Sequence, residues 1–420
     1  MAAIKRKDDF KAQCGFLYDG PLEINATQKL SFSKIFVNLQ GNSWCNNFGW
    51  IGQTKTVTRD PIPVFGVAVS LCDGITALKK KDISKANYIA KLNLSGYGCT
   101  GQLPDNLSCL QDCEYINMSY NLITGSLPLT LSSLRSLQEL NFSSNMLKGS
   151  LNASTLSKLT SLILLDLSFN HLNGPIPDIF GHLKSMETLS LSSNRLEGTI
   201  PESISNLIAL KALKLNANLL IGNIPESFSR LRALRHVNLS QNRISGGLSH
   251  FYGCIQLETL QLQSNELSGH LTSHVSQLQH LSVLYLQNNH LSGTLPIEIG
   301  QLTHLQRLNL SHNNFKGILP EEIGRLTRLE SLLLTNNALI GPIPLSIAHL
   351  SLLRDFHVFR PYPSQGFIPS RAHDRHTFQR VYLFGPSQGL DNIHWDHQQL
   401  YGQERSSQDD DVVSVFTGQL

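Results

Sequence analysis

Two histidine pairs near the carboxyl end have the residue type and spacing for metal chemistry. His373 and His376 are three residues apart, as are His394 and His397, and an aspartate lies inside each pair. Four imidazoles can bind zinc tetrahedrally, so this spacing permits a zinc site or a metal-dependent activity in the C-terminal segment. No cysteine joins the set, and histidines also occur on polar surfaces. A metal-free polar segment is therefore the competing interpretation.

A second set of side chains suits recognition. Its members flank alternating leucines from residue 214 onward, and alternation places them on one exposed face. They are Lys214, His236, Gln261, Gln263, Tyr285, Gln287, Arg307 and His312. Tyr285 and Arg307 are of types enriched at binding hot spots, and the face carries few charges. These features favour a largely neutral protein, peptide or glycan ligand; the competing interpretation is a solvated face whose residues vary by drift.

Composition and motifs exclude several classes of function. The chain has 34 basic and 31 acidic residues, a net charge of +3, which is too balanced to suggest nucleic-acid binding. No run of about 18 apolar residues predicts a membrane helix. The sequence contains no glycine-rich phosphate loop and no kinase motif. We therefore expect no enzyme activity, no cofactor and no nucleic-acid partner.

The elements that must position the polar residues are repeats of about 24 residues. Each unit has a Leu-X-Leu-X-X-Asn run, as in residues 165–170, and a glycine four residues after the asparagine in all eleven units. The asparagine column comprises Asn121, Asn145, Asn170, Asn194, Asn218, Asn242, Asn265, Asn289, Asn313 and Asn337, with Tyr97 at this place in the first unit. A fixed period of this length predicts a solenoid, in which each unit buries its apolar face against its neighbours.

Each column of the repeat has a physical role. The alternating leucines predict a short strand with one buried face, and stacked strands form a parallel sheet with a spacing of about 4.8 Å. The asparagine amide can satisfy backbone groups of the turn that follows. The glycine permits a tight turn, and the proline found in most units ends the next extended piece. Residues 202–207 have helical spacing and predict a short helical turn on the convex side.

The repeat resembles the leucine-rich repeat family, and its Gly-X-Ile-Pro element, as in residues 198–201, is similar to the plant-type class. The resemblance covers roughly residues 89–359 and implies an α/β solenoid: a curved horseshoe with a parallel concave sheet and short convex helical turns. It also implies recognition of a protein, peptide or glycan on the concave face, in signalling or defence, without catalytic residues. Many members are receptor ectodomains, so a truncated receptor-like ectodomain is the alternative.

The segments outside the repeats differ in composition. Residues 1–88 are predicted to form an N-terminal cap, because Trp44 and Trp50 resemble the tryptophans of leucine-rich repeat caps and suit covering an open solenoid end. A tryptophan-lined ligand site is the alternative role. Residues 360–402 are rich in aromatic residues and predict a C-terminal cap. Residues 403–420 are predicted to be a disordered tail.

The seven cysteines and the N-terminus bear on the cellular compartment. Cys99, Cys113 and Cys254 stand where other units have leucine or isoleucine, so we expect buried thiols. Pairing of Cys45 with Cys72, or of Cys109 with Cys113, is left open. No apolar signal-peptide core follows the first residues. A cytoplasmic location is therefore favoured, with an extracellular one as the alternative if the N-terminus is incomplete.

Overall fold

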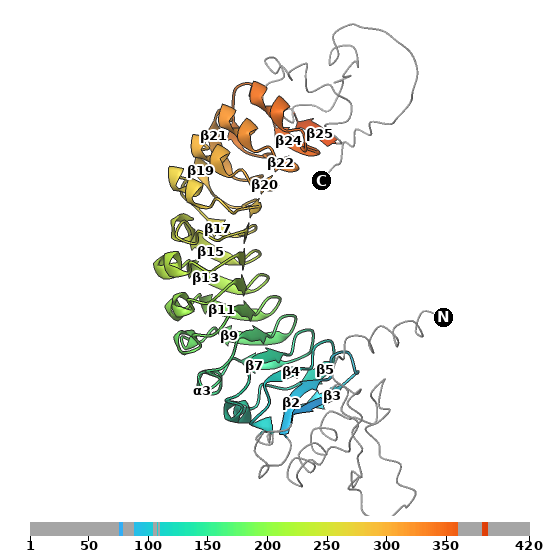
Figure 1. The fold of residues 1–420 in the computed structure, drawn as a ribbon. Helices are drawn as coiled ribbons and strands as arrows, with labels where there is room; N and C mark the ends of the chain where they lie inside the picture. The colour runs from blue at the N-terminus through green and yellow to red at the C-terminus, as the bar shows by residue number, and fades with distance from the viewer. Residues whose placement is uncertain (1–74, 79–87, 104–106, 108–109, 360–379, 385–420) are drawn as a thin grey trace, which may run out of the picture.

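The computed structural model describes residues 75–78, 88–103, 107, 110–359 and 380–384, and these form a curved solenoid (Figure 1). Its concave side is a sheet of 14 strands in this part of the chain. The strands are β1 (Ile75–Leu78), β2 (Tyr88–Asn93), β4 (Tyr115–Asn117), β6 (Glu139–Asn141), β8 (Leu164–Asp166), β10 (Thr188–Ser190), β12 (Ala212–Lys214), β14 (His236–Asn238), β16 (Thr259–Gln261), β18 (Val283–Tyr285), β20 (Arg307–Asn309), β22 (Ser331–Leu333), β24 (Asp355–Phe359) and β25 (Arg380–Phe384). Every neighbouring pair is parallel except β1 and β2, which confirms the predicted concave sheet.

A second layer of short parallel strands runs beside the main sheet, and the sequence pattern did not predict it. One sheet contains β7 (Lys148–Ser150), β9 (His171–Pro175), β11 (Arg195–Thr199), β13 (Leu219–Asn223), β15 (Arg243–Gly246) and β17 (Glu266–Leu267). Shorter sheets contain β19 (Ser292–Gly293), β21 (Asn314–Gly317) and β23 (Ala338–Leu339), and β3 (Thr100–Gln102) with β5 (Leu122–Thr124). The segment predicted as a turn and a short extended piece thus pairs with the same segment of the next unit.

Short helical turns cover the convex side, as predicted from the helical spacing (Figure 1). Most are 3-10 helices: η3 (Leu129–Ser133), η4 (Phe180–His182), η5 (Glu202–Asn206), η6 (Glu226–Arg230), η7 (Ser249–Phe251), η8 (Ser273–Gln277), η9 (Ile297–Gln301), η10 (Glu321–Arg325) and η11 (Leu345–His349). The exception is the α-helix α3 (Ala153–Leu156), where Asn152 replaces the usual proline. The Asn152 side chain caps this helix by accepting the Thr155 backbone N–H at 3.1 Å.

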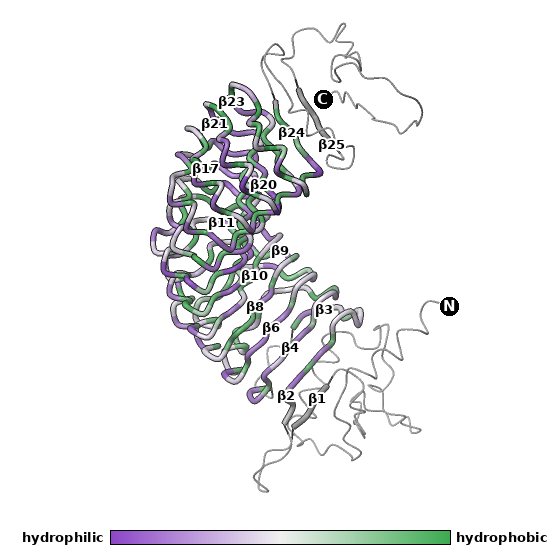
Figure 2. The backbone as a smooth tube through the Cα atoms, turned by 45° about the horizontal axis from the view of Figure 1, so that its top comes forward, coloured by the Kyte–Doolittle hydropathy of each residue, from purple (hydrophilic) through white to green (hydrophobic). Residues whose placement is uncertain are grey.

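The hydrophobic core lies between the main sheet and the convex turns. The central leucines of the main-sheet strands are buried, and five phenylalanines are fully buried in the same core: Phe142, Phe180, Phe228, Phe251 and Phe315. Figure 2 shows hydrophobic and hydrophilic stretches alternating along each coil. Cys99, Cys113 and Cys254 are buried in this core, as expected because other units have leucine or isoleucine at these positions.

The asparagine and glycine columns have the predicted roles. In each of the ten units from Asn121 to Asn337, the asparagine accepts a backbone N–H from the preceding unit and donates to backbone carbonyls of both units. The glycine four residues later has φ between 74° and 93° in all eleven units, a region that favours glycine. These two columns therefore hold one unit to the next and turn the chain between the two sheets.

Several predictions fall on segments outside the described residues. These include most of the N-terminal cap, residues 360–379 and 385–402 of the C-terminal cap, the tail at 403–420, and Cys45, Cys72 and Cys109. Strands β1 and β25 extend the main sheet into the two segments assigned to caps. The domain limits themselves stay predictions.

Candidate functional site

The outward side chains of the main sheet form two columns along the concave face. Parallel register aligns Lys214, Asn238, Gln261, Tyr285 and Asn309 in one column. The same register aligns His236 and Arg307, with one residue of each intervening strand, in the column two residues earlier. The predicted binding residues on β12 to β20 therefore share one continuous surface.

Tyr285 and Arg307 lie on the neighbouring strands β18 and β20, as expected. Arg307 pairs in register with Val283, two residues before Tyr285 on the same face, so Tyr285 and Arg307 are diagonal neighbours. Adjacent strands are about 4.8 Å apart, which lets both side chains contact one ligand. Arg307 is exposed and Tyr285 is half-buried. Together they offer an amphipathic ring next to a guanidinium group.

Two glutamines beside this pair have unsatisfied polar atoms. Gln263 and Gln287 follow β16 and β18, and the Oε1 atom of each is buried with no hydrogen-bond partner among the described residues. A buried carbonyl oxygen without a donor is costly and rare in folded proteins. Rotation of either glutamine side chain would bring its oxygen to the surface, where a ligand that donates N–H or O–H groups could bind it.

The remaining predicted residues lie further from the pair. His236 Nε2 is 3.9 Å from Glu258, and Arg235 contacts the same carboxylate at 3.1 Å. All three side chains are exposed by more than a third, so these ion pairs add little stability. Lys214 is exposed on β12. His312 lies in the turn after β20, beside the Asn336 amide, and so faces the rim of the sheet.

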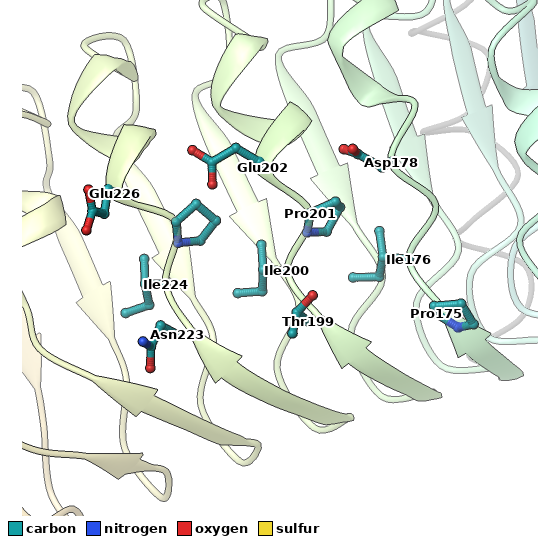
Figure 3. Close-up of a pocket in the computed structure, with 11 residues that line it drawn as sticks. Pro175, Ile176, Asp178, Thr199, Ile200, Pro201, Glu202, Asn223, Ile224 and Glu226 are labelled. Carbon is teal, nitrogen blue, oxygen red and sulfur yellow. The ribbon is translucent and has the colours of Figure 1, made fainter.

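A groove of about 520 Å³ crosses the units containing β9, β11 and β13, where these strands end and lead into the convex turns (Figure 3). One carboxylate from each unit lines it: Asp178, Glu202 and Glu226. Asp178 accepts the Ser203 backbone N–H at 3.1 Å, and Glu202 accepts the Ser227 hydroxyl. Two of the three carboxylates thus link successive convex turns, and we assign no ligand to the groove.

The part of the chain that the structure describes contains no cluster of metal-binding side chains. No group of three or more His, Cys, Asp or Glu side chains there is arranged to hold a metal ion. His373, His376, His394 and His397 lie outside the described residues, so the zinc site stays a prediction. Within the described ranges, no helix has the length and apolarity needed to cross a bilayer.

Comparison with known families supports the repeat assignment. A model described as leucine rich repeat matches residues 185–244 and 279–339, and a second leucine rich repeat model matches residues 161–183. Among curated proteins, none matches the sequence.

Solved structures share the fold over much of the chain. The Arabidopsis receptor kinase HAESA, in complex with the peptide hormone IDA and the co-receptor SERK1, is 33% identical with a TM-score of 0.61, covering 64% of this chain and 46% of that chain. The plant peptide hormone receptor RGFR1 in complex with RGF2 is 34% identical with a TM-score of 0.60. The match covers 62% of this chain and 43% of that chain. The chain thus spans less than half the length of either receptor chain.

A third similar structure is of a different kind. A plant ice-binding protein is 26% identical with a TM-score of 0.54, and the match covers 77% of this chain and 90% of that chain. The same curved solenoid therefore occurs both in receptor ectodomains and in a much shorter protein.

Proposed function

We propose that this chain is a non-catalytic recognition module of the leucine-rich repeat kind, which binds a peptide or protein segment on its concave face. The observation that carries the proposal is the pairing of Tyr285 with Arg307 beside the unsatisfied oxygens of Gln263 and Gln287. Once the glutamine side chains rotate outward, an extended peptide would supply backbone N–H donors to these oxygens. Tyr285 would pack against an apolar side chain, and Arg307 would bind a carbonyl or carboxylate group.

Similarity to receptor structures supports a peptide over a glycan. Two of the similar structures are described as peptide hormone receptors or complexes of them. The ligand we infer has few charges, because the outward residues on β12 to β20 contain no acidic side chain and only Lys214, His236 and Arg307 as basic ones. We propose a receptor-like role in signalling or defence.

We also propose that the protein works outside the cell. The cytoplasmic location favoured by the first residues finds no support in the comparisons, since similar structures include a receptor-kinase ectodomain. An oxidising compartment is compatible with the described cysteines, because all three are buried in the core.

A site-specific cross-linking experiment tests the proposed surface. A photoreactive amino acid replaces Gln261 on the concave face in one protein, and Arg232 on the convex side in another. Each protein is mixed with a displayed library of random 12-residue peptides and irradiated. We expect Gln261, and not Arg232, to yield cross-linked peptides that compete with one another. Equal yields from both positions would refute a concave ligand site.

Ice binding is a second candidate, favoured by the near-complete coverage of the plant ice-binding protein. Ice-binding faces need regularly spaced polar groups, and Asn93, Asn117 and Asn141 are aligned in register on β2, β4 and β6. The regular column ends at Asp166 on β8. Measurement of ice recrystallisation in the presence of the purified protein distinguishes this activity from peptide recognition.

A further inference from the structure

Four large apolar side chains are exposed together in the second to fourth units, far from the concave ligand site. The exposed fractions are 71% for Tyr120, 55% for Leu122, 44% for Met146 and 60% for Phe169. We call these four residues the lateral patch. They flank the bends where the chain passes from the main sheet to the second layer, at β5 and just before β7 and β9. Exposed aromatic and aliphatic groups gathered in this way mark interaction surfaces.

The backbone at the two aromatic residues makes their presence more informative. Tyr120 and Phe169 each have φ of 55°, in the left-handed region that bulky residues rarely adopt. The equivalent position in other units holds smaller or polar residues: Gly96, Ser144, Ser193, Ala217, Gln241, Ser264, Asn288, His312 and Asn336. Neither burial nor backbone preference favours an aromatic residue here. A binding role explains why aromatic residues occur at these two exposed positions of positive φ.

Within the second layer of strands, the charged side chain beside the lateral patch is basic. Lys148 on β7 pairs in register with His171 on β9, and both are exposed. The strands β5, β7 and β9 contain no acidic residue, and Glu197 on β11 is the first one along this layer. The patch therefore combines an apolar surface with the Lys148 ammonium group on the side of the second layer.

We propose that the lateral patch docks a partner polypeptide whose aromatic or aliphatic side chains stand next to a carboxylate. The apolar groups would cover Tyr120, Phe169 and Met146, and the carboxylate would bind Lys148. A second copy of this chain fits less well. A twofold dimer places the same patch on both sides, so Lys148 would face the strands β5, β7 and β9 of the second copy, which contain no acidic residue to pair with it.

The patch is separate from the concave ligand site. Phe169 belongs to the fourth unit and Tyr285 to the ninth, so five strand spacings, about 24 Å, lie between them. A short ligand at Tyr285 therefore leaves the lateral patch open. The inference does not depend on the proposed concave site.

A display experiment with matched variants tests the lateral patch. The full chain is used to select from a random 12-residue peptide library, and selected peptides are synthesised. Their affinities are measured for the wild type, Tyr120→Asn/Phe169→Asn, Lys148→Glu and Tyr285→Ala. Asparagine already occupies this turn position at Asn288 and Asn336, so the double variant should keep or raise the melting temperature.

We expect one group of peptides with apolar and acidic residues. Its affinity should fall at least tenfold in the double variant and several-fold in Lys148→Glu, and stay unchanged in Tyr285→Ala. The proposal is overturned if no such group is selected, or if its affinity is equal for the wild type and the double variant. It is also overturned if gel filtration with light scattering shows a wild-type dimer that the double variant abolishes, because a second copy would then occupy the patch.

Discussion

The side-chain oxygen of Asn194 accepts the backbone N–H of Leu172, 22 residues earlier in the chain, at 2.9 Å. Its Nδ2 atom donates to the carbonyl of Leu167 at 3.0 Å in the same earlier unit, and to that of Leu191 at 3.2 Å in its own unit. One amide thus satisfies backbone groups of two successive units. The same arrangement repeats along the solenoid and makes the asparagine column a set of links between units.

Replacement of this amide should destabilise the fold. In Asn194→Leu, the Leu172 N–H and the facing carbonyls lose their partner in a half-buried site. We expect the free energy of unfolding to drop by roughly 2–5 kcal/mol, since each unsatisfied buried group costs about 1–3 kcal/mol. Urea unfolding measures the change. Asn173→Leu, at an exposed position on β9, is the matched control and should have little effect; equal stability of both variants would contradict the linking role.

Close packing between successive convex turns leads to a second prediction about stability. A Cβ atom added at Gly300 in η9 would lie 2.3 Å from the backbone oxygen of Glu322 in the next unit. Gly300→Ala should therefore lower the free energy of unfolding by about 1–3 kcal/mol, the usual range for overpacking. A Cβ atom added at Gly247 would lie 3.8 Å from its nearest neighbour, the backbone oxygen of Ser268. Gly247→Ala should therefore change the free energy of unfolding little. Thermal unfolding of the two variants compares them, and a Gly300→Ala melting temperature equal to wild type would count against this packing.

The buried thiols make a prediction about pH. Desolvation by burial raises the pKa of Cys99 and of Cys254 from the ordinary 9.0 to about 12. The folded state therefore favours the neutral thiols, and the stability that they contribute is complete below pH 9 and is lost as pH rises toward 12. We expect the fall in unfolding free energy between pH 9 and 11 to be smaller in Cys99→Ala/Cys254→Ala than in wild type. Identical slopes would contradict the raised pKa values.

The periodic columns explain why so much of the fold could be predicted from the sequence. A leucine, asparagine or glycine that returns at the same place in each unit has the same environment each time, so its role can be inferred from residue type. The positive φ of all eleven glycines and the bonds of the asparagine amides confirm this reasoning. The second layer of strands was not predicted. Its segments, such as Arg195–Thr199, contain one buried leucine before the glycine, too short an alternation to indicate a strand.

Only part of the candidate site could be predicted from the sequence. Alternation indicates which side chains face the concave side, and the register confirms that Tyr285 and Arg307 are neighbours. Whether a polar atom has a partner depends on its neighbours in other units, so the unsatisfied oxygens of Gln263 and Gln287 required the structure. Tyr120 and Phe169 could have been found, because they are aromatic in a column that otherwise holds small or polar residues.

The central claim is that a ligand binds the concave face at Tyr285 and Arg307. Its most direct test is titration calorimetry with a free synthetic peptide that was identified by cross-linking to the concave face. The proteins compared are the wild type, Tyr285→Ala, Arg307→Ala and the convex control Arg230→Ala/Arg232→Ala. Each concave variant should lose about tenfold or more in affinity, corresponding to about 1.4 kcal/mol or more, at an unchanged melting temperature. The convex control should bind as wild type does. Undiminished binding by both concave variants, with loss in the convex control, would contradict the account.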